Sequence, residues 1–304
     1  MEPHWISSDP CDNPVGRAVT LVTIRRLPYL CRMASREDTP GTALTARLQQ
    51  DLPQKRVLII DRYPAARDAL RTMLSTLGIT AVTGAGTTHE ALRQVKAASF
   101  DILLSDYVLD EGRDGQQLLE ELRLNHLIPL GTVFMVITGE RAYQSVVSVA
   151  ELAPDDYLIK PFTADQLQAR LLKAVFKKDF FAPVYRRLDE GAYIAALNAC
   201  NQLLTNTSPF ELDVLRLKGE ILNALGRHEE AEAVYREVLK RRSVPWARMG
   251  LATALRGARS LEEAESLAQL VVAEYPDYLS AYDFLAGVRE ELGQLEGAQQ
   301  ILQR

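Results

Sequence analysis

The stretch Phe100-Asp-Ile-Leu-Leu-Ser-Asp106 is an apolar run that ends in a carboxylate. Its length and composition predict a buried β-strand. Three further runs also end in a polar side chain: Val57 to Asp61, Thr132 to Thr138 and Tyr157 to Lys160. Since the strands of an open parallel sheet end at one edge, where ligands bind, we expect these four terminal side chains to lie close together.

Helical patterns alternate with these runs, and the alternation predicts a doubly wound α/β domain in which helices cover both faces of a five-stranded parallel sheet. Ile79 to Val82 is the candidate for the fifth strand. Helix starts are predicted at Pro64 and at two capping boxes, Thr87-Thr-His-Glu90 and Thr163-Ala-Asp-Gln166. Gly78 is predicted to stop the first helix. The remaining helices are expected over residues 116–124 and 142–152.

Together these motifs resemble the phosphorylation site of a two-component receiver domain, which has a flavodoxin-like fold, over residues 55–178. The resemblance implies that Asp106 is the phosphoacceptor, that Lys160 neutralises a phosphoryl oxygen and that Thr138 donates a hydrogen bond to another. It further implies that Tyr157 is the aromatic switch residue of the last strand. The Lys160-Pro161 peptide bond is expected to be cis.

The same resemblance implies a Mg²⁺ site, because a metal screens the repulsion between the attacking carboxylate and the phosphoryl group. Its ligands would be Asp61, Asp106 and the backbone carbonyl of Val108. Arg62 departs from the family pattern, since it stands where a second acid usually follows the first. If Arg62 points into the pocket, the two carboxylates and two cations sum to zero and Mg²⁺ would bind poorly. If Arg62 turns out to solvent, Asp61 binds the metal alone.

A second departure is the loop from Tyr107 to Gly115, which is one residue longer than usual. Asp110, Glu111 and Asp114 in this loop supply negative charge that compensates for the missing acid, or they form a solvated turn. The residues alone leave both interpretations open.

Beyond residue 178 a self-similar pattern replaces the alternation. Ala196, Ala231, Ala264 and Ala298 stand 35, 33 and 34 residues apart, and a glycine precedes each of them. The pattern resembles tetratricopeptide repeats (TPR), all-α pairs of antiparallel helices, over residues 179–304. Gly257 precedes its alanine by two residues more than the other glycines do, which predicts two extra residues in that turn. The small residues expected to let neighbouring helices approach are Gly219, Ala231, Gly250 and Ala264.

A stack of helix pairs makes a groove that binds peptides or other proteins, so the resemblance implies a protein-binding output domain. A spacer or dimerisation domain is the alternative for this region. The basic cluster Lys240-Arg-Arg242 is expected at the end of a repeat helix, where cations suit the helix dipole. The apolar end at Ile301 and Leu302 predicts a homodimer, or further repeats beyond residue 304.

Composition bears on the remaining function classes. The net charge is −5, without the basic surplus of a nucleic-acid binder, so no DNA is expected as a partner. No apolar run reaches the roughly 20 residues that span a bilayer, so no membrane is expected either. Three scattered cysteines give no disulfide or metal pattern, which favours a reducing cytoplasm. Residues 1–54 are expected to be a disordered extension, with the true start at Met1 or Met33.

The resemblance therefore implies a cytoplasmic response regulator of a bacterial two-component phosphorelay, phosphorylated on Asp106 with Mg²⁺. A histidine kinase or phosphotransfer protein would be the donor, and the TPR groove would bind an unknown protein or peptide. The change is expected to reach the repeats through residues 178–184, by dimerisation or domain release. The chain would be no enzyme beyond its own phosphotransfer and dephosphorylation. The alternative is a phosphorylation-independent pseudo-receiver and TPR scaffold, which Arg62 favours and the other pocket residues disfavour.

Overall fold

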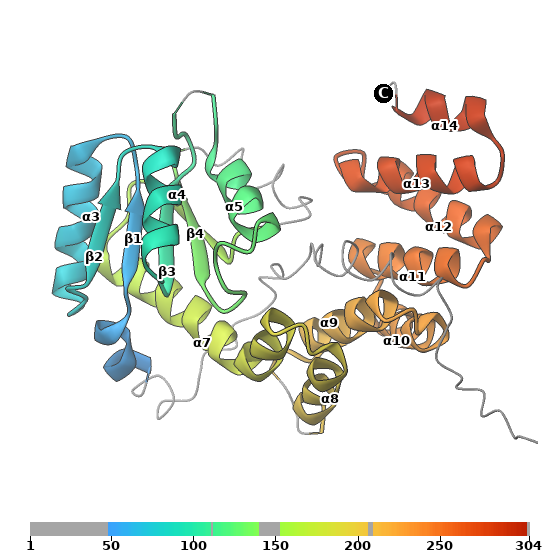
Figure 1. Cartoon of the computed structure of the whole chain (residues 1–304), viewed down its shortest axis with the longest axis horizontal. Coiled ribbons are helices and arrows are strands. Elements are labelled where there is room, and N and C mark those ends of the chain that lie inside the picture. The colour runs from blue at the N-terminus through green and yellow to red at the C-terminus, as the bar shows by residue number, and fades with distance from the viewer. Residues whose placement is uncertain (1–47, 111, 140–152, 206–208, 303–304) are drawn as a thin grey trace, which may run out of the picture.

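Strands and helices alternate in the first part of the chain. The computed structural model describes residues 48–110, 112–139, 153–205 and 209–302. Five parallel strands form one sheet in the order β2-β1-β3-β4-β5 (Figure 1). The predicted five-stranded parallel sheet is therefore confirmed. The strands are β1 Val57–Ile60, β2 Val82–Ala85, β3 Ile102–Asp106, β4 Val133–Thr138 and β5 Asp156–Ile159.

The register of the sheet brings two acidic residues together at one edge. β1 pairs with β2 on one side and with β3 on the other, so the strand order reverses between β1 and β3. Ile60 lies opposite Ser105, which sets Asp61 beside Asp106 at the carboxyl ends of these two strands. A topological switch point of this kind opens a crevice where α/β sheets bind their ligands.

Helices cover both faces of the sheet, as the alternation predicts (Figure 1). Helices α3 (Pro64–Thr76) and α7 (Ala164–Asp189) pack on one face, and their core residues include Leu70, Leu74, Leu167 and Leu171. Helices α4 (Thr88–Ala97) and α5 (Gly115–Leu124) pack on the other, with Ala91, Val95, Leu118 and Leu122. All side chains of β1 and β4 are buried, as expected of strands between two helix layers.

Two helices of this domain begin at the predicted capping boxes. The Thr163 box is complete, because the Thr163 side chain accepts from the N–H of Gln166 and the Gln166 side chain accepts from the N–H of Thr163. At Thr87 only the first half of the box forms. The Glu90 carboxylate accepts instead from the N–H of Gly86 at 2.8 Å.

The strand expected over Ile79 to Val82 is wrong in position, because Ile79 belongs to the cap of helix α3. Gly78 has a φ of +80°, and the N–H of Ile79 donates to the carbonyl of Leu74 at 3.0 Å. This bond closes a Schellman motif, whose last residue is commonly apolar and packed against the helix. Strand β2 begins only at the last residue of the expected range.

Ordered structure begins before residue 55. Residues 48–51 are helical, and Leu52–Gln54 form the short 3-10 helix η2. Leu48 and Leu52 are buried in the core that α3 and α7 share, so burial of apolar surface holds this segment in place. The expected disordered extension is therefore wrong for residues 48–54. Residues 1–47, and the helix expected over 142–152, lie outside the described residues.

One continuous helix, α7, joins the sheet to the helices that follow (Figure 1). Lys178, the expected last residue of the first domain, lies inside this helix and is buried. Its side chain forms an ion pair with Asp155 at 2.8 Å and donates to the carbonyl of Leu130 at 2.9 Å. Asp189, the last residue of α7, accepts from the N–H of Leu130 at 3.2 Å. The second half of α7 is thus bound to the loops that precede β4 and β5.

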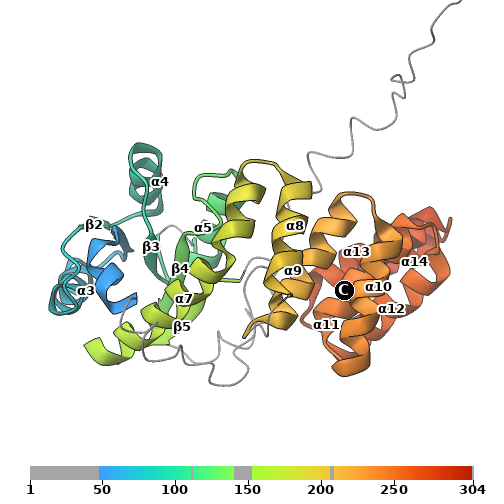
Figure 2. The same cartoon turned by 90° about the horizontal axis from the view of Figure 1, so that it is seen from below.

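Seven helices follow α7 within the described residues, and they stack away from the sheet (Figure 2). Each contacts the next along the chain, and α9, α11 and α13 begin 34 residues apart. This spacing agrees with the sequence repeat, while the TPR type of the repeat remains a prediction. The helices are α8 Tyr193–Leu203, α9 Glu211–Ala224, α10 His228–Arg241, α11 Pro245–Gly257, α12 Leu261–Glu274, α13 Leu279–Glu291 and α14 Leu295–Leu302.

The turns after α7, α9, α11 and α13 share one backbone conformation. Each turn has three residues, and the middle one has a positive φ: Gly191, Gly226, Arg259 and Gly293. The two extra residues expected at Gly257 are therefore wrong, since Gly257 is the last residue of α11 and Arg259 takes the glycine's place with a φ of 67°. A non-glycine residue in this left-handed region costs roughly 1–2 kcal/mol.

Replacing Arg259 by glycine is expected to stabilise the chain by about 1 kcal/mol, because glycine adopts a positive φ without steric strain. The ion pair that is lost, to Glu291 at 3.1 Å, adds little because the Arg259 side chain is 77% exposed. Urea denaturation followed by circular dichroism measures the change. Ala258→Gly is the matched control, and it should destabilise, since Ala258 has a φ of −78°. An unchanged or lower midpoint for Arg259→Gly would contradict this account of the turn.

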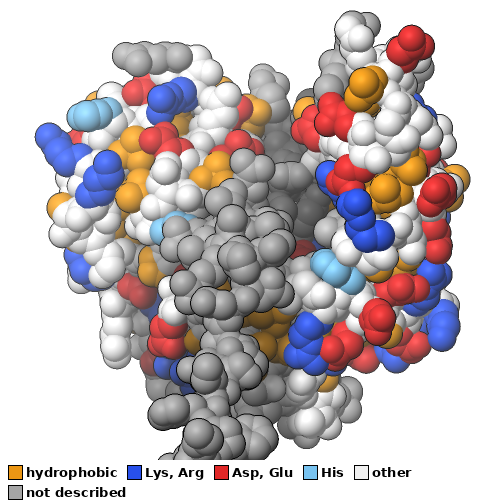
Figure 3. Space-filling view, turned by 45° about the vertical axis from the view of Figure 1, so that its right-hand side comes forward, with side chains coloured by type: hydrophobic (Ala, Val, Ile, Leu, Met, Phe, Trp, Pro, Cys, Tyr) orange, Lys and Arg blue, Asp and Glu red, His pale blue; other side chains and the backbone are white. Residues whose placement is uncertain are grey.

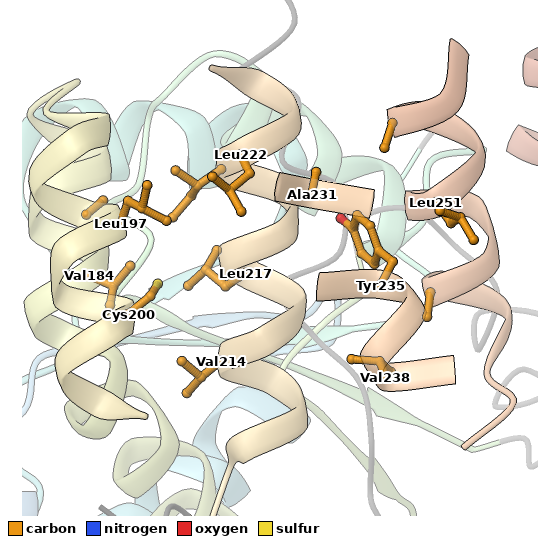
Figure 4. Close-up of a cluster of buried hydrophobic side chains, with 14 of the residues drawn as sticks. Val184, Leu197, Cys200, Val214, Leu217, Leu222, Ala231, Tyr235, Val238 and Leu251 are labelled. Carbon is orange, nitrogen blue, oxygen red and sulfur yellow. The ribbon is translucent and has the colours of Figure 1, made fainter. Parts of the chain in front are cut away.

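The core of the helical stack includes Tyr235 of α10, which is 1% exposed (Figure 4). A Cβ atom added to Gly219 of α9 or to Gly250 of α11 would overlap the Tyr235 ring. The two glycines therefore leave the space that this ring fills, as expected of small residues between neighbouring helices. Trp246 approaches the same ring edge-on, with the ring centroids 6.4 Å apart, and so contributes to packing.

Acidic and basic side chains are mixed on the surface of the helical stack (Figure 3). Several pair between helices that are two apart along the chain, as Arg236 of α10 does with Glu263 of α12 at 2.7 Å and Arg256 of α11 with Glu291 of α13 at 2.6 Å. Because opposite charges are paired in this way, they largely cancel each other's electrostatic potential at the surface. Among the helices described, including the 26 residues of α7, none combines the length and apolar character that a bilayer span requires.

Candidate functional site

Three of the predicted side chains meet at the carboxyl edge of the sheet. Lys160, one residue after β5, donates from Nζ to Asp106 Oδ1 at 2.9 Å and to Asp61 Oδ2 at 3.3 Å. Asp61 follows β1 and is 1% exposed, while the Asp106 side chain at the end of β3 is 12% exposed. One ammonium group therefore bridges two carboxylates that neighbouring strands deliver to the switch point of the sheet.

The charges of this site shift the pKa values of two of its members. Burial raises the pKa of the Asp106 carboxyl; the hydrogen bond and charge of Lys160 oppose the rise, and the charge of Asp61 adds to it. For Lys160, burial acts to lower the pKa, but the hydrogen bonds and charges of both carboxylates raise it above its ordinary value. Lys160 therefore stays positively charged beside Asp106, where it can meet an incoming anion.

Thr138, the predicted hydrogen-bond donor, and Tyr157, the predicted switch residue, lie on the strands that lead to this site. Thr138 is the last residue of β4 and is 2% exposed, and its carbonyl accepts from the N–H of Lys160 at 2.7 Å. Tyr157, the second residue of β5, is 5% exposed and belongs to the core on the α4 and α5 side of the sheet. The bond between Lys160 and Pro161 is cis, as expected.

Arg62 lies at the surface of the turn that follows Asp61. It is exposed, and its guanidinium lies 4.7 Å from the ring centroid of Tyr63. Asp61 Oδ1 accepts from the N–H of Tyr63 at 2.9 Å, which closes a tight turn around Arg62. Of the two orientations considered for Arg62, the structure shows the outward one. Two carboxylates and the Lys160 ammonium then leave the pocket with a formal charge of −1.

The loop after β3 is held by two helix caps. Asp110 accepts from the N–H of Thr88 at 3.0 Å and also from the Thr88 hydroxyl, so it caps α4 from outside that helix. Asp114 caps α5 by accepting from the N–H of Gln117 at 2.8 Å. Asp110 and Asp114 thus serve as helix caps, a role that neither interpretation made from the sequence included. Glu111 lies outside the described residues.

Replacing Asp110 by alanine is expected to destabilise the chain by about 1 kcal/mol at neutral pH, the usual value of a helix cap. Burial acts to raise the pKa of Asp110, but the hydrogen bonds from Thr88 lower it below the ordinary 3.8. The cap's contribution is therefore complete above pH 3.8 and is lost as the pH falls through the lower folded-state value. Urea denaturation between pH 7 and pH 3 measures this loss. Asp68→Ala, at a side chain 71% exposed, is the control and should change little.

The same loop positions the backbone carbonyl of Val108, a predicted metal ligand. Val108 pairs with Asp114 in an isolated antiparallel bridge. On either side of it, the N–H of Tyr107 donates to Ile137 at 2.9 Å and the N–H of Gly115 donates to Tyr107 at 2.8 Å. These bonds tie the loop to β4 and to the start of α5, so the Asp114 cap supports the site indirectly.

Sequence reasoning missed three residues that support the site. A Cβ atom on Gly115 would lie 2.7 Å from the carbonyl oxygen of Asp106, so only glycine fits against the end of β3. The Ser105 hydroxyl donates to that same carbonyl at 3.0 Å. Arg67 Nη1 donates to the carbonyl of Asp61 at 2.7 Å. The glycine directly after the Asp114 cap was a readable signal, whereas Ser105 and Arg67 had none.

The oxygen donors at this edge fit a magnesium ion that keeps most of its water. In the part of the chain that the structure describes, no three Asp, Glu, His or Cys side chains gather to hold a metal. Asp61 and Asp106 supply two carboxylates, and Mg²⁺ is commonly held by one or two carboxylates together with water and phosphate oxygens. Both Asp61 oxygens already accept hydrogen bonds, from Tyr63 and from Lys160. The two carboxylates therefore fit Mg²⁺ as a weak site, and the Val108 carbonyl as a third ligand stays a prediction.

Comparison with known proteins identifies the first part of the chain. Residues 57–172 match the family model of the response regulator receiver domain. Similar solved structures include a response regulator of Thermotoga maritima in complex with Mg²⁺ and BeF, 25% identical, covering 40% of this chain and 98% of that one with a TM-score of 0.35. Another is a receiver domain protein of Methanospirillum hungatei, 28% identical, covering 41% and 96% with a TM-score of 0.36. Because the family model and the order of the strands agree, we conclude that residues 57–172 are a response regulator receiver domain.

Proposed function

We propose that this chain is a response regulator that accepts a phosphoryl group on Asp106 and signals through its helical stack. The observation that carries the proposal is the contact of Lys160 with both Asp61 and Asp106 at the switch point of the sheet. A largely buried carboxylate beside a fixed ammonium group suits the transfer of a phosphoryl group, because the cation offsets the charge that develops.

In the proposed step, an oxygen of Asp106 attacks the phosphorus of a phosphohistidine on a partner protein. A P–O bond forms, the P–N bond breaks, and the imidazole leaves with the bonding electrons. Lys160 would hold one phosphoryl oxygen, and the Thr138 hydroxyl would donate to a second. A Mg²⁺ ion held by Asp61, Asp106 and the Val108 carbonyl would add positive charge to the phosphoryl oxygens. The chain is then a phosphoacceptor rather than an enzyme acting on other substrates.

The proposed partners follow from the two parts of the chain. A receiver domain takes its phosphoryl group from a histidine kinase or a phosphotransfer protein. Stacked helix pairs of the TPR type would bind a protein or peptide, and the 34-residue spacing of α9, α11 and α13 supports this assignment. The helical stack would alternatively act by forming a homodimer.

Helix α7 is the proposed route from the receiver to the stack. Its first half packs on the sheet, and Lys178 and Asp189 in its second half bind Leu130. A displacement of the first half would move the attached helices as one body. Domain release through residues 178–184, the route suggested by the order of the domains, does not fit a helix that continues through them.

The test uses beryllofluoride, which mimics a phosphoryl group on aspartate, together with Mg²⁺ on the full chain. We expect altered hydrogen exchange along α7 and α8, or a changed oligomeric state, in the wild type. Asp106→Asn should show neither change. Wild-type protein that binds beryllofluoride and changes neither its exchange nor its oligomeric state would contradict the proposed coupling.

A phosphorylation-independent scaffold is the second candidate, and Arg62 is the observation that favours it. With a cation in place of the second acid, the pocket attracts a metal less strongly. Under this alternative the helical stack would bind its partner equally well in the wild type and in Asp106→Asn, and beryllofluoride would have no effect on that binding.

A further inference from the structure

We infer that Arg62 binds an oxygen of the phosphoryl group on Asp106, so that the pocket accepts phosphate largely without Mg²⁺. The inference rests on the proposed function of Asp106 as phosphoacceptor. It assigns to Arg62 the positive charge that a metal would otherwise supply.

Arg62 is next in sequence to a residue of the pocket, and its exposed side chain is available to bind an anion. It directly follows Asp61, whose strand pairs with the strand that ends in Asp106. Among the described residues no carboxylate pairs with Arg62, and its contact is the exposed ring of Tyr63, a weak attraction. Nearby Arg67, in contrast, is engaged with the carbonyl of Asp61 at 2.7 Å.

The charge of the pocket favours a second cation over a tightly bound metal. The two carboxylates and Lys160 sum to −1, and phosphorylation replaces the single charge of Asp106 by roughly two negative charges, so the phosphorylated pocket carries about −2. Both oxygens of Asp61 already accept hydrogen bonds, which leaves few oxygen donors for a metal. A guanidinium can bind two phosphoryl oxygens at once through its planar N–H groups, which suits it to this role.

The reaction with acetyl phosphate can proceed on the chain's own groups. An oxygen of Asp106 attacks phosphorus, the bond from phosphorus to the acetyl oxygen breaks, and acetate leaves with the bonding electrons. Lys160 and Arg62 offset charge on the phosphoryl oxygens and exchange no proton with them. The product is an aspartyl phosphate whose oxygens both cations can hold.

The experiment compares full-length wild type, Arg62→Ala, Arg62→Lys and Arg62→Asp by intact mass during incubation with acetyl phosphate, in Mg²⁺ and in EDTA. We expect the wild type to form the adduct in EDTA, and Arg62→Ala to slow that reaction by about 10- to 100-fold. The rate of Arg62→Lys in EDTA should fall between those of the wild type and Arg62→Ala, because lysine keeps the positive charge but lacks the planar pair of N–H donors of a guanidinium. Arg93→Ala, at a side chain 69% exposed on α4, is the control and should match the wild type.

Calorimetric titration with Mg²⁺ alone gives a readout that does not depend on phosphorylation. Arg62→Asp should bind Mg²⁺ at least about tenfold more tightly than the wild type, because it restores an acid and removes a cation. A wild-type adduct that forms only with Mg²⁺, or an Arg62→Ala rate in EDTA equal to that of the wild type, would overturn the role of Arg62 and leave Asp106 as phosphoacceptor. No wild-type adduct in either buffer would overturn the proposed function and this inference with it. Thermal melting checks that the variants are folded.

Discussion

Lys178→Met is expected to lower the free energy of unfolding by about 3–5 kcal/mol, the usual result of removing one partner from a buried ion pair. The Lys178 and Asp155 side chains are 7% and 9% exposed, so the variant would leave the Asp155 carboxylate buried without its cation. The carbonyl of Leu130 would lose a hydrogen bond at 2.9 Å, and Tyr185 would lose a cation 5.2 Å from its ring centroid. Three interactions of one side chain therefore disappear together.

Urea denaturation followed by circular dichroism measures the effect, and the neighbouring lysine is its control. Lys177 pairs with Asp213 at 2.9 Å, but these side chains are 20% and 22% exposed, so Lys177→Met should cost about 1 kcal/mol or less. Adding Asp155→Asn to Lys178→Met should recover part of the loss, because the buried negative charge that Lys178 no longer balances is removed. Equal losses for the two lysine variants would contradict the view that the buried ion pair of Lys178 stabilises the chain more than the partly exposed pair of Lys177.

Gly250→Ala is expected to destabilise the chain by about 3 kcal/mol, because the added methyl group overlaps a ring that cannot move away. Tyr235 is 1% exposed and lies between Gly250 of α11 and Gly219 of α9, so a shift away from one glycine brings it toward the other. Three neighbouring helices would have to separate to make room. The same urea measurement gives the loss.

Gly257→Ala, at the last residue of α11, is the matched control. Its Cβ would overlap the ring of His228, but His228 lies at the first residue of α10 and is only half-buried, so it can turn toward solvent. Alanine also gains about 1 kcal/mol of helix propensity over glycine, which offsets the remaining cost. A loss for Gly257→Ala as large as that for Gly250→Ala would contradict the view that the buried Tyr235 ring sets the helix spacing.

The features that could be predicted from the sequence are those that a local pattern determines. Four of the five strands of the receiver end at, or one residue before, the polar residue that closes the apolar run in the sequence, and parallel pairing then brings Asp61, Asp106 and Lys160 to one edge. The 34-residue spacing of the helices follows in the same way from small residues at fixed intervals. The local pattern gave a wrong prediction at Ile79, which belongs to the C-terminal cap of a helix and not to a strand. It gave another at Arg259, which has a positive φ although it is not a glycine.

The features that could not be predicted depend on partners far apart in the chain. Asp110 caps a helix that begins 22 residues before it, so the composition of its own loop carried no sign of this role. Lys178 is buried because α7 continues past the sheet, where the Lys178 side chain contacts Asp155 and the carbonyl of Leu130. Only the packing of complete helices decides such contacts, which is why the sequence placed the domain boundary at residue 178, inside a helix that continues to Asp189.

The central claim, that Asp106 accepts a phosphoryl group, is tested most directly by the intact mass of the full chain after incubation with acetyl phosphate and Mg²⁺. We predict a single phosphoryl adduct on the wild type and none on Asp106→Asn. Wild-type protein that stays unmodified, or an adduct that persists in Asp106→Asn, would contradict the claim.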